Sequence, residues 1–93
     1  MIIFITKDKT GRNIRLTETQ WKHIKFRHPH FGNKPMEIKN TIENPTLMVK
    51  LTNKITKYYR YLKSEDKYIM VAVKILNHEG FIITAYNTKK IQK

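Results

Sequence analysis

The fold is decided by residues 68–86, which read YIMVAVKILNHEGFIITAY. Two apolar runs, 68–76 and 81–86, are rich in Ile, Val and Tyr, which favour β-strands. The polar stretch 77–80 between them contains Asn and Gly, a composition typical of tight turns. The pattern therefore predicts an antiparallel hairpin.

The length of the turn decides which side chains share a face of this hairpin. Lys74 alternates with apolar residues of the expected core and so lies on the open face of the first strand. A three-residue loop, 78–80, places Lys74 opposite Thr84, and Lys74, Thr84 and Tyr86 then line one surface. A four-residue loop, 77–80, turns Thr84 toward the core instead. Both registers fit the sequence.

Strand-like composition continues outward from the hairpin. Segments 47–51 and 55–62 have the same mixture of β-branched and aromatic residues, and they predict two more strands. Near the N-terminus, 2–6 predicts a first strand. A short returning strand, 14–16, follows a turn that contains Gly11.

Two helices are expected between these groups of strands. Thr17 is a good N-cap, and Gln20 stands three residues later, as in a capping box. This helix extends to about Arg27, because Pro29 disfavours helical geometry in the residue before it. Segment 35–43 predicts a second, shorter helix that begins with proline and ends before an Asn-Pro pair.

This order of elements predicts an α+β fold. We expect an N-terminal strand or two strands, with two helices packed on one face of a four- to five-stranded antiparallel sheet. A chain of 93 residues has room for one modest core, so residues 1–93 are expected to form a single domain.

The charge balance indicates a polyanionic partner. The chain has 19 Lys plus Arg against 7 Asp plus Glu, which gives a formal net charge of +12 spread over both halves. Such a field attracts nucleic acid, an anionic membrane or an acidic protein. No apolar run approaches the roughly 20 residues that a spanning helix needs, so no membrane association and a cytoplasmic location are expected.

A group of basic side chains lies between residues 23 and 30. His23, Arg27, His28 and His30 gather there, and imidazole exchanges protons near neutral pH. Arginine beside it is suited to holding phosphate. The group matches the needs of RNA cleavage by the ribose 2′-hydroxyl: a base, an acid and a cation for the developing charge.

A structural interpretation competes with this catalytic one. Trp21, Ile24 and His28 fall in one narrow sector of the helix and form its expected core face. His28 then is a half-buried structural histidine, and His23 and Arg27 are solvated residues of the neighbouring face.

The sequence favours chemistry without metal or cofactor. No cysteine is present, and the histidine spacing fits no common zinc pattern. A two-metal nuclease needs several converging carboxylates, whereas the adjacent acidic pair Glu65-Asp66 lies in an expected turn.

Further candidates for RNA binding lie outside this group. Tyr59 and Arg60 belong to a run of aromatic residues around a cation, which can stack bases and hold phosphates. Tyrosines of this kind are also ordinary strand residues, half-buried on either face. Lys74 and Lys22 complete the expected RNA-binding set.

The motifs together resemble a known family. In order, the chain carries His23-Ile24, then Arg27-His28-Pro29, then Glu43-Asn44-Pro45, and finally Thr84-Ala85-Tyr86. This set resembles small phage-associated nucleases of the Barnase–EndoU–colicin–RelE superfamily.

The resemblance implies a metal-independent endoribonuclease that acts as a toxin on tRNA or other RNA, from a prophage or toxin–antitoxin setting. It implies that His23 and His28 are the acid and base, that Arg27 holds phosphate, and that Thr84 and Tyr86 complete the site. An acidic antitoxin or immunity protein is the implied partner. The alternatives are a non-catalytic RNA- or DNA-binding module and a phage-encoded inhibitor of a host protein.

Overall fold

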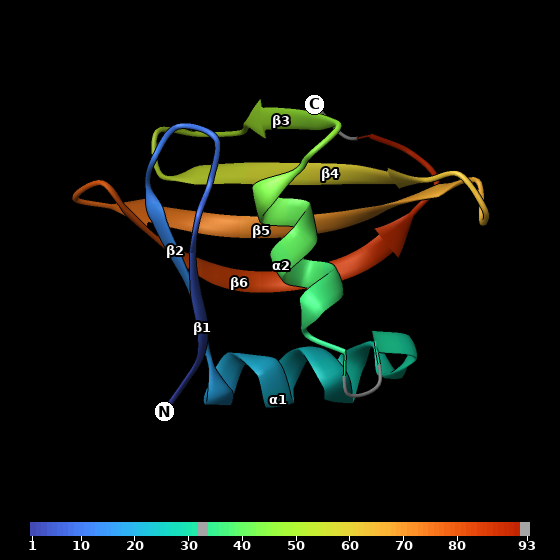
Figure 1. Cartoon of the computed structure of the whole chain (residues 1–93), viewed down its shortest axis with the longest axis horizontal. Coiled ribbons are helices and arrows are strands. Elements are labelled where there is room, and N and C mark those ends of the chain that lie inside the picture. Colours follow the sequence, from blue (N-terminus) through green and yellow to red (C-terminus); the bar gives the residue numbers. More distant parts are fainter. Residues whose placement is uncertain (32–33, 92–93) are drawn as a thin grey trace.

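The computed structural model describes residues 1–31 and 34–91, which form one mixed sheet with two α-helices (Figure 1). The strands are β1 Ile2–Lys7, β2 Asn13–Thr17, β3 Leu47–Lys50, β4 Ile55–Leu62, β5 Lys67–Leu76 and β6 Glu79–Thr88. The helices are α1 Glu18–Arg27 and α2 Met36–Glu43, with a 3₁₀ turn, η1, at Pro29–Phe31. No helix of the described residues is long and apolar enough to cross a membrane.

The expected α+β class is confirmed, but the sheet differs in size and direction from the four or five antiparallel strands expected. It has six strands in the order β1-β2-β6-β5-β4-β3. The N-terminal hairpin joins through a short parallel contact in which residues 13–15 of β2 pair with residues 79–81 of β6. The other neighbours pair antiparallel.

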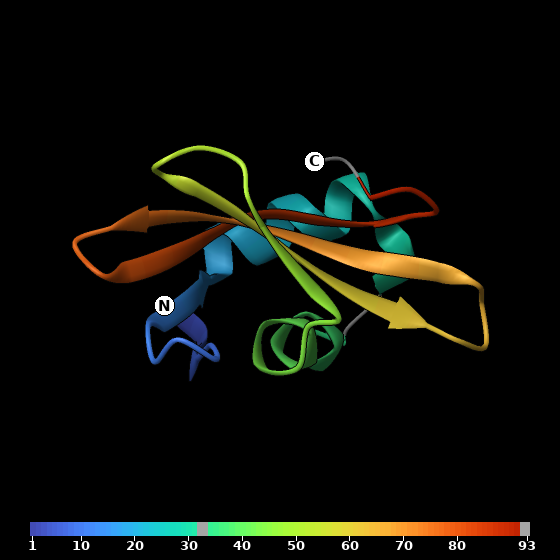
Figure 2. The same ribbon diagram turned by 90° about the horizontal axis from the view of Figure 1, so that it is seen from above.

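The two helices occupy different places, whereas both were expected on one face. Helix α2 crosses the same face of the sheet as β1 (Figure 2). Helix α1 extends along the sheet edge beside β6 (Figure 1). The main core lies under α2, where Ile38 and Ile42 pack with Val71 and Val73 of β5. A smaller cluster around Tyr59, Met70 and Ala72 covers the opposite face.

Helix α1 begins and ends where its sequence predicts. The Thr17 hydroxyl accepts a hydrogen bond from the Gln20 backbone N–H at 3.2 Å. At the other end, the His28 N–H donates to the Ile24 carbonyl at 2.8 Å. Trp21 and Ile24 are buried, whereas Phe26 on the far side of the helix is 87% exposed. The burial of its apolar face and the capping of its ends therefore both stabilise this helix.

Both expected registers of the β5–β6 hairpin are wrong. Asn77 and His78 form a two-residue turn with φ of 51° and 68°, the left-handed conformation that tight hairpins require. Glu79 therefore already pairs with Leu76. A register shift follows, so that Ala72 pairs with Thr84 and Met70 pairs with Tyr86.

Buried Asp8 connects the β1–β2 turn to Tyr58 of β4. Its Oδ1 accepts from Thr10 and from the Arg12 backbone N–H at 3.0 Å. Its Oδ2 accepts from Arg12 Nε at 3.1 Å and from the Tyr58 hydroxyl at 2.5 Å. Burial alone raises the pKa of Asp8, but hydrogen bonds from Tyr58, Thr10 and Arg12 outweigh it and hold the pKa below the ordinary 3.8.

Asp8→Asn is expected to lower the free energy of unfolding at neutral pH by about 1–3 kcal/mol. The amide nitrogen that replaces one carboxylate oxygen cannot accept the hydrogen bonds that this oxygen received. Since the folded state binds the Asp8 proton more weakly, native Asp8 stabilises the protein above pH 3.8 and loses this effect as the pH falls through its lowered pKa. Urea unfolding across the acid range measures both effects.

The matched control is Asp66→Asn, because Asp66 is exposed and hydrogen-bonded to Tyr61. It should change stability by less than about 0.5 kcal/mol. A stability difference between native protein and Asp8→Asn that persists unchanged through the acid range would contradict the assigned charge state.

Gly80 is required by the close packing where β2 meets β6. A Cβ there would lie 2.3 Å from Ile14 Cδ1 and 2.8 Å from Val73 Cγ1. Gly80→Ala should therefore destabilise by about 1–3 kcal/mol. Ile14→Val, which removes the nearest atom, should cost about 0.5–1.5 kcal/mol alone. In a urea-unfolding double-mutant cycle, the double variant should be less destabilised than the sum, whereas additive losses would show that this contact is not the cause.

Candidate functional site

Strand β6 pairs with β2 only up to residue 81, and beyond that point helix α1 lies beside β6. The Gln20 side-chain N–H donates to the Ile83 carbonyl at 2.6 Å. Ile83 lies where the β5–β6 register shifts. In a full capping box the Gln20 side chain would hydrogen-bond to the backbone N–H of the N-cap residue. Here it bonds to β6 instead and joins the helix to the strand. We call the line where α1 and its cap residue His28 adjoin residues 83–86 the α1–β6 seam.

The His28 and Tyr86 rings meet at this seam. Their centroids lie 5.7 Å apart and their planes are inclined by 44°. Both side chains are half-buried. The backbone of His28 is held at the end of α1, and Tyr86 pairs with Met70 inside the sheet. Two rigid elements thus fix the imidazole against the phenol ring.

Thr84 extends the seam along the strand. It is half-buried and lies two residues before Tyr86, so the two side chains share one face of the sheet. The predicted residues Thr84, Tyr86 and His28 therefore come together.

His23 and Arg27 lie on the exposed flank of α1. At 3.6 residues per turn, Arg27 is about 20° and His23 about 60° around the helix from Gln20. Because the Gln20 side chain hydrogen-bonds to β6, this side of the helix lies next to the strand, and its residues His23 and Arg27 are exposed to solvent. The two residues border the seam without being enclosed by it. The His30 side chain lies outside the part of the chain that the structure describes.

Lys74 and Lys22 remain at the surface. Lys74 is exposed and pairs with Phe81, on the same face as Thr84. Lys22 lies on α1 and forms an ion pair with Glu18 at 3.1 Å. Lys74 thus extends the face that carries the seam, whereas Lys22 has its charge partly compensated.

Arg60 and Tyr59 do not join the seam. Arg60 points to the face covered by α2, where it forms an ion pair with Glu37 at 2.5 Å and donates to the Thr41 hydroxyl at 3.3 Å. Tyr59 lies on the seam's face but is only 1% exposed, packed with Met70. Its ring is not accessible for base stacking in this conformation.

Arg15 is a surface cation that the sequence interpretation omitted. Its guanidinium lies 5.2 Å from the centre of the Phe81 ring and pairs with Glu79 at 3.0 Å. Its Nε is buried without a hydrogen-bond partner among the described residues. Arg15 stands between the core residues Ile14 and Leu16, so strand alternation predicts that it lies on the opposite face. There it lies on the same side as Lys74, on the other side of Phe81.

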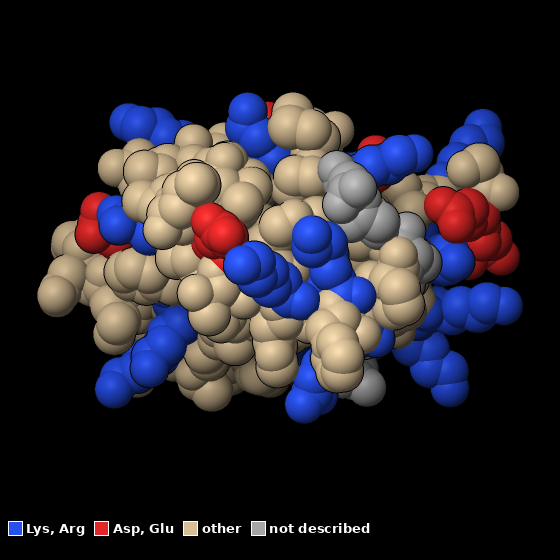
Figure 3. Space-filling view, turned by 90° about the horizontal axis from the view of Figure 1, so that it is seen from below, with Lys and Arg blue, Asp and Glu red and all other residues tan. Residues whose placement is uncertain are grey.

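The charged side chains on the surface around α1 are mainly basic. Figure 3 looks onto the edge that carries this helix, and Lys and Arg atoms are spread across it while most acidic atoms lie near the margins. Among the side chains that the structure describes, which leave out that of His30, no three His, Asp or Glu converge as a metal-binding group.

No protein-family model, curated protein or solved structure matches the chain.

The contact between His28 and Tyr86 should be measurable as a coupling energy. Unfolding of His28→Asn, Tyr86→Leu and the double variant is expected to give a coupling of about 0.5–1.5 kcal/mol, typical of packed ring pairs. In a parallel cycle that replaces His28→Asn by His78→Asn, the changes should be additive, because His78 lies in the distant hairpin turn. Equal coupling in both cycles would contradict a direct contact.

Proposed function

We propose that the protein is a metal-independent endoribonuclease whose reaction takes place at the α1–β6 seam. The observation that carries the proposal is the His28 imidazole held against Tyr86, on a chain of net charge +12 in which exposed Arg27 immediately precedes His28. This arrangement joins a proton carrier to a phosphate-binding cation within an electropositive surface.

The proposed reaction is an internal phosphoryl transfer. A base removes the proton of the ribose 2′-hydroxyl, and this oxygen attacks the neighbouring phosphorus. The new O2′–P bond forms as the P–O5′ bond breaks, and an acid donates a proton to the departing 5′-oxygen. The products are a 2′,3′-cyclic phosphate and a 5′-hydroxyl. The 2′-hydroxyl requirement makes RNA the substrate and excludes DNA.

His28 and His23 are the proton carriers of this proposal. The half-buried His28 has its ring position restricted by Tyr86, whereas the exposed His23 is free to meet substrate from the solvent side. Arg27 binds the phosphate and stabilises charge on its oxygens as the bonds exchange. Thr84 and Tyr86 offer hydroxyl groups to the same phosphate.

Lys74 and Arg15 provide a path for the rest of the RNA. Both lie on the face that carries Thr84, beside Phe81. Cations near an aromatic ring suit a single-stranded polynucleotide, whose phosphates and bases they contact together. A transfer RNA with an exposed loop fits this requirement.

Cleavage of total tRNA in the presence of EDTA tests the proposal. We expect cleavage with terminal cyclic phosphates, detected by gel electrophoresis and mass spectrometry. His28→Asn and His23→Gln should each lower the rate by roughly 100-fold or more, the usual contribution of a positioned acid or base. Thermal unfolding of each variant shows whether a loss reflects unfolding.

The matched control is His78→Asn, because His78 lies in the β5–β6 turn and asparagine tolerates its φ of 68°. Its cleavage rate should equal that of the native protein. Salt-sensitive RNA binding without cleavage would instead indicate a non-catalytic RNA-binding module, and cleavage only after metal addition would contradict the metal-free mechanism.

A further inference from the structure

Helix α1 exposes an aromatic ring on the flank that carries His23 and Arg27. Phe26 is 87% exposed, whereas the apolar residues on the opposite side of the helix are buried. At 3.6 residues per turn, Phe26 lies about 120° around the helix from Gln20, in the same direction as Arg27 and His23. Arg27, His23 and Phe26 therefore follow one another around α1, away from the seam.

The ring of Phe26 is a neighbour of His23 and Lys22 on the helix surface. Side chains three or four positions apart in a helix have Cβ atoms about 5–6 Å from each other. His23 and Lys22 precede Phe26 by three and four positions, and all three side chains are exposed. A group that covers the ring is therefore close to His23, the exposed proton carrier of the proposed reaction.

The neighbours of Phe26 indicate what kind of partner covers it. A single exposed apolar side chain is common on protein surfaces and does not by itself mark a site. The other exposed residues of α1 are polar or basic, namely Thr19, Lys22, His23 and Arg27. An aromatic anchor of a protein interface is typically enclosed by further contacts that exclude water. An isolated ring among cations instead suits single-stranded RNA, whose bases stack on the ring while its phosphates meet the cations.

The charge on α1 also suits a polyanion. The helix carries Lys22, Lys25 and Arg27 against one carboxylate, that of Glu18. Glu18 pairs with Lys22 at 3.1 Å, and the Lys25 ammonium lies 5.3 Å from the centre of the Trp21 ring. No unpaired carboxylate of α1 is left to repel a phosphate that Arg27 binds, and basic side chains predominate on this edge (Figure 3).

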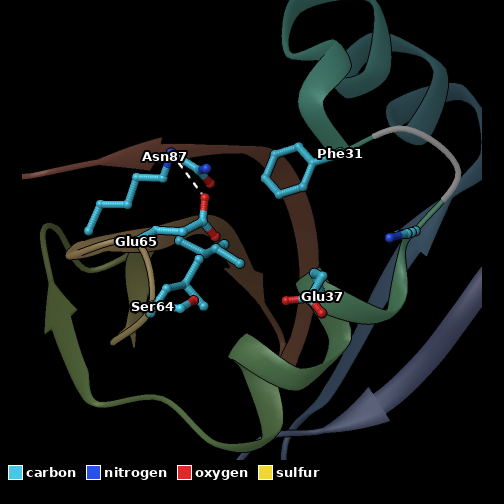
Figure 4. A pocket seen from close by; sticks show the side chains of 9 residues that line it. Phe31, Glu37, Ser64, Glu65 and Asn87 are labelled. Atoms are coloured by element: carbon cyan, nitrogen blue, oxygen red, sulfur yellow. Dashed lines mark ion pairs between the residues drawn. The ribbon is translucent and has the colours of Figure 1, made fainter.

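The cavity on the face of the sheet opposite the seam offers no such surface. It has a volume of about 420 Å³ and opens between the start of α2, the turn η1 and the β4–β5 hairpin (Figure 4). Its aromatic residue, Phe31, is 4% exposed, and the carboxylates of Glu37 and Glu65 line its walls. Asn87 lines it from β6, but the Asn87 Oδ1 atom is buried. Since carboxylates repel phosphate, RNA is better matched by the exposed flank of α1.

We propose that Phe26 is a substrate-positioning residue that stacks on an unpaired base of the RNA, next to the phosphate held by Arg27. This inference rests on the proposed function for its substrate class. Stacking holds the adjoining ribose and phosphate beside His23. A base inside a duplex has its faces covered by its neighbours, so the ring selects single-stranded RNA. It does so without strong sequence preference, because every base has a π-face.

Binding of a fluorescently labelled 2′-O-methyl oligoribonucleotide, which cannot be cleaved, tests the stacking role. Phe26→Ala should weaken binding by roughly tenfold, within the range of one lost base–aromatic stack, whereas Phe26→Trp should keep the native affinity. An abasic oligonucleotide of the same length should bind native protein and Phe26→Ala equally. The matched control is Leu51→Ala, which removes a side chain 46% exposed between β3 and β4 and should bind like the native protein.

Three results would overturn the assignment: native affinity in Phe26→Ala, equal losses in Phe26→Ala and Phe26→Trp, or a loss that persists with the abasic oligonucleotide. Thermal unfolding should give the same midpoint for all variants, because Phe26 and Leu51 are exposed. Base-dependent binding through Phe26 without RNA cleavage would remove only the proposed function. Cleavage at the native rate in Phe26→Ala, with unchanged affinity, would remove only the stacking role.

Discussion

The structure depends on how the edge of β6 is shared between a strand and a helix. Residues 79–81 of β6 pair in parallel with 13–15 of β2, and beyond them α1 occupies the same edge. Thr17 is both the last residue of β2 and the N-cap of α1. The chain thus turns from strand to helix within one residue, so the direction of β2 determines where α1 lies.

This shared edge explains why candidate groups from distant parts of the sequence meet. The capped helix ends at His28, and the β6 register brings Tyr86 to its side at a ring distance of 5.7 Å. The hydrogen bond from Gln20 to Ile83 fixes the relative position of helix and strand. Strand alternation then sends Asn87 to the opposite face, so that one strand contributes to the seam and to the cavity.

Local sequence signals predicted the elements well, because capping and strand composition act within a few residues. Helix α1 was predictable from Thr17 and Pro29, and β4 to β6 from their β-branched and aromatic content. The hairpin register was not, because Asn77 and His78 adopt a left-handed turn and the following shift has no sequence signature. The parallel contact of β2 with β6 joins segments far apart in the chain, which local patterns do not reveal.

The site was predictable only in part for the same reason. Motif positions indicated His28 and Tyr86, whose contact is present. Strand alternation places Arg60 on the same face of β4 as buried Tyr58. The local sequence does not show that α2 covers this face. Asn87 was not predictable, because a single polar residue near a strand end carries no signal until the cavity around it is known.

The most direct test of the α1–β6 seam as the RNA site is a chemical-shift map of the protein with an oligoribonucleotide whose 2′-hydroxyls are methylated, so that it binds without being cleaved. The largest shifts should fall on His23, Arg27, His28, Thr84 and Tyr86. Shifts confined to the far strands, around exposed β3 residues such as Lys50, would contradict the account.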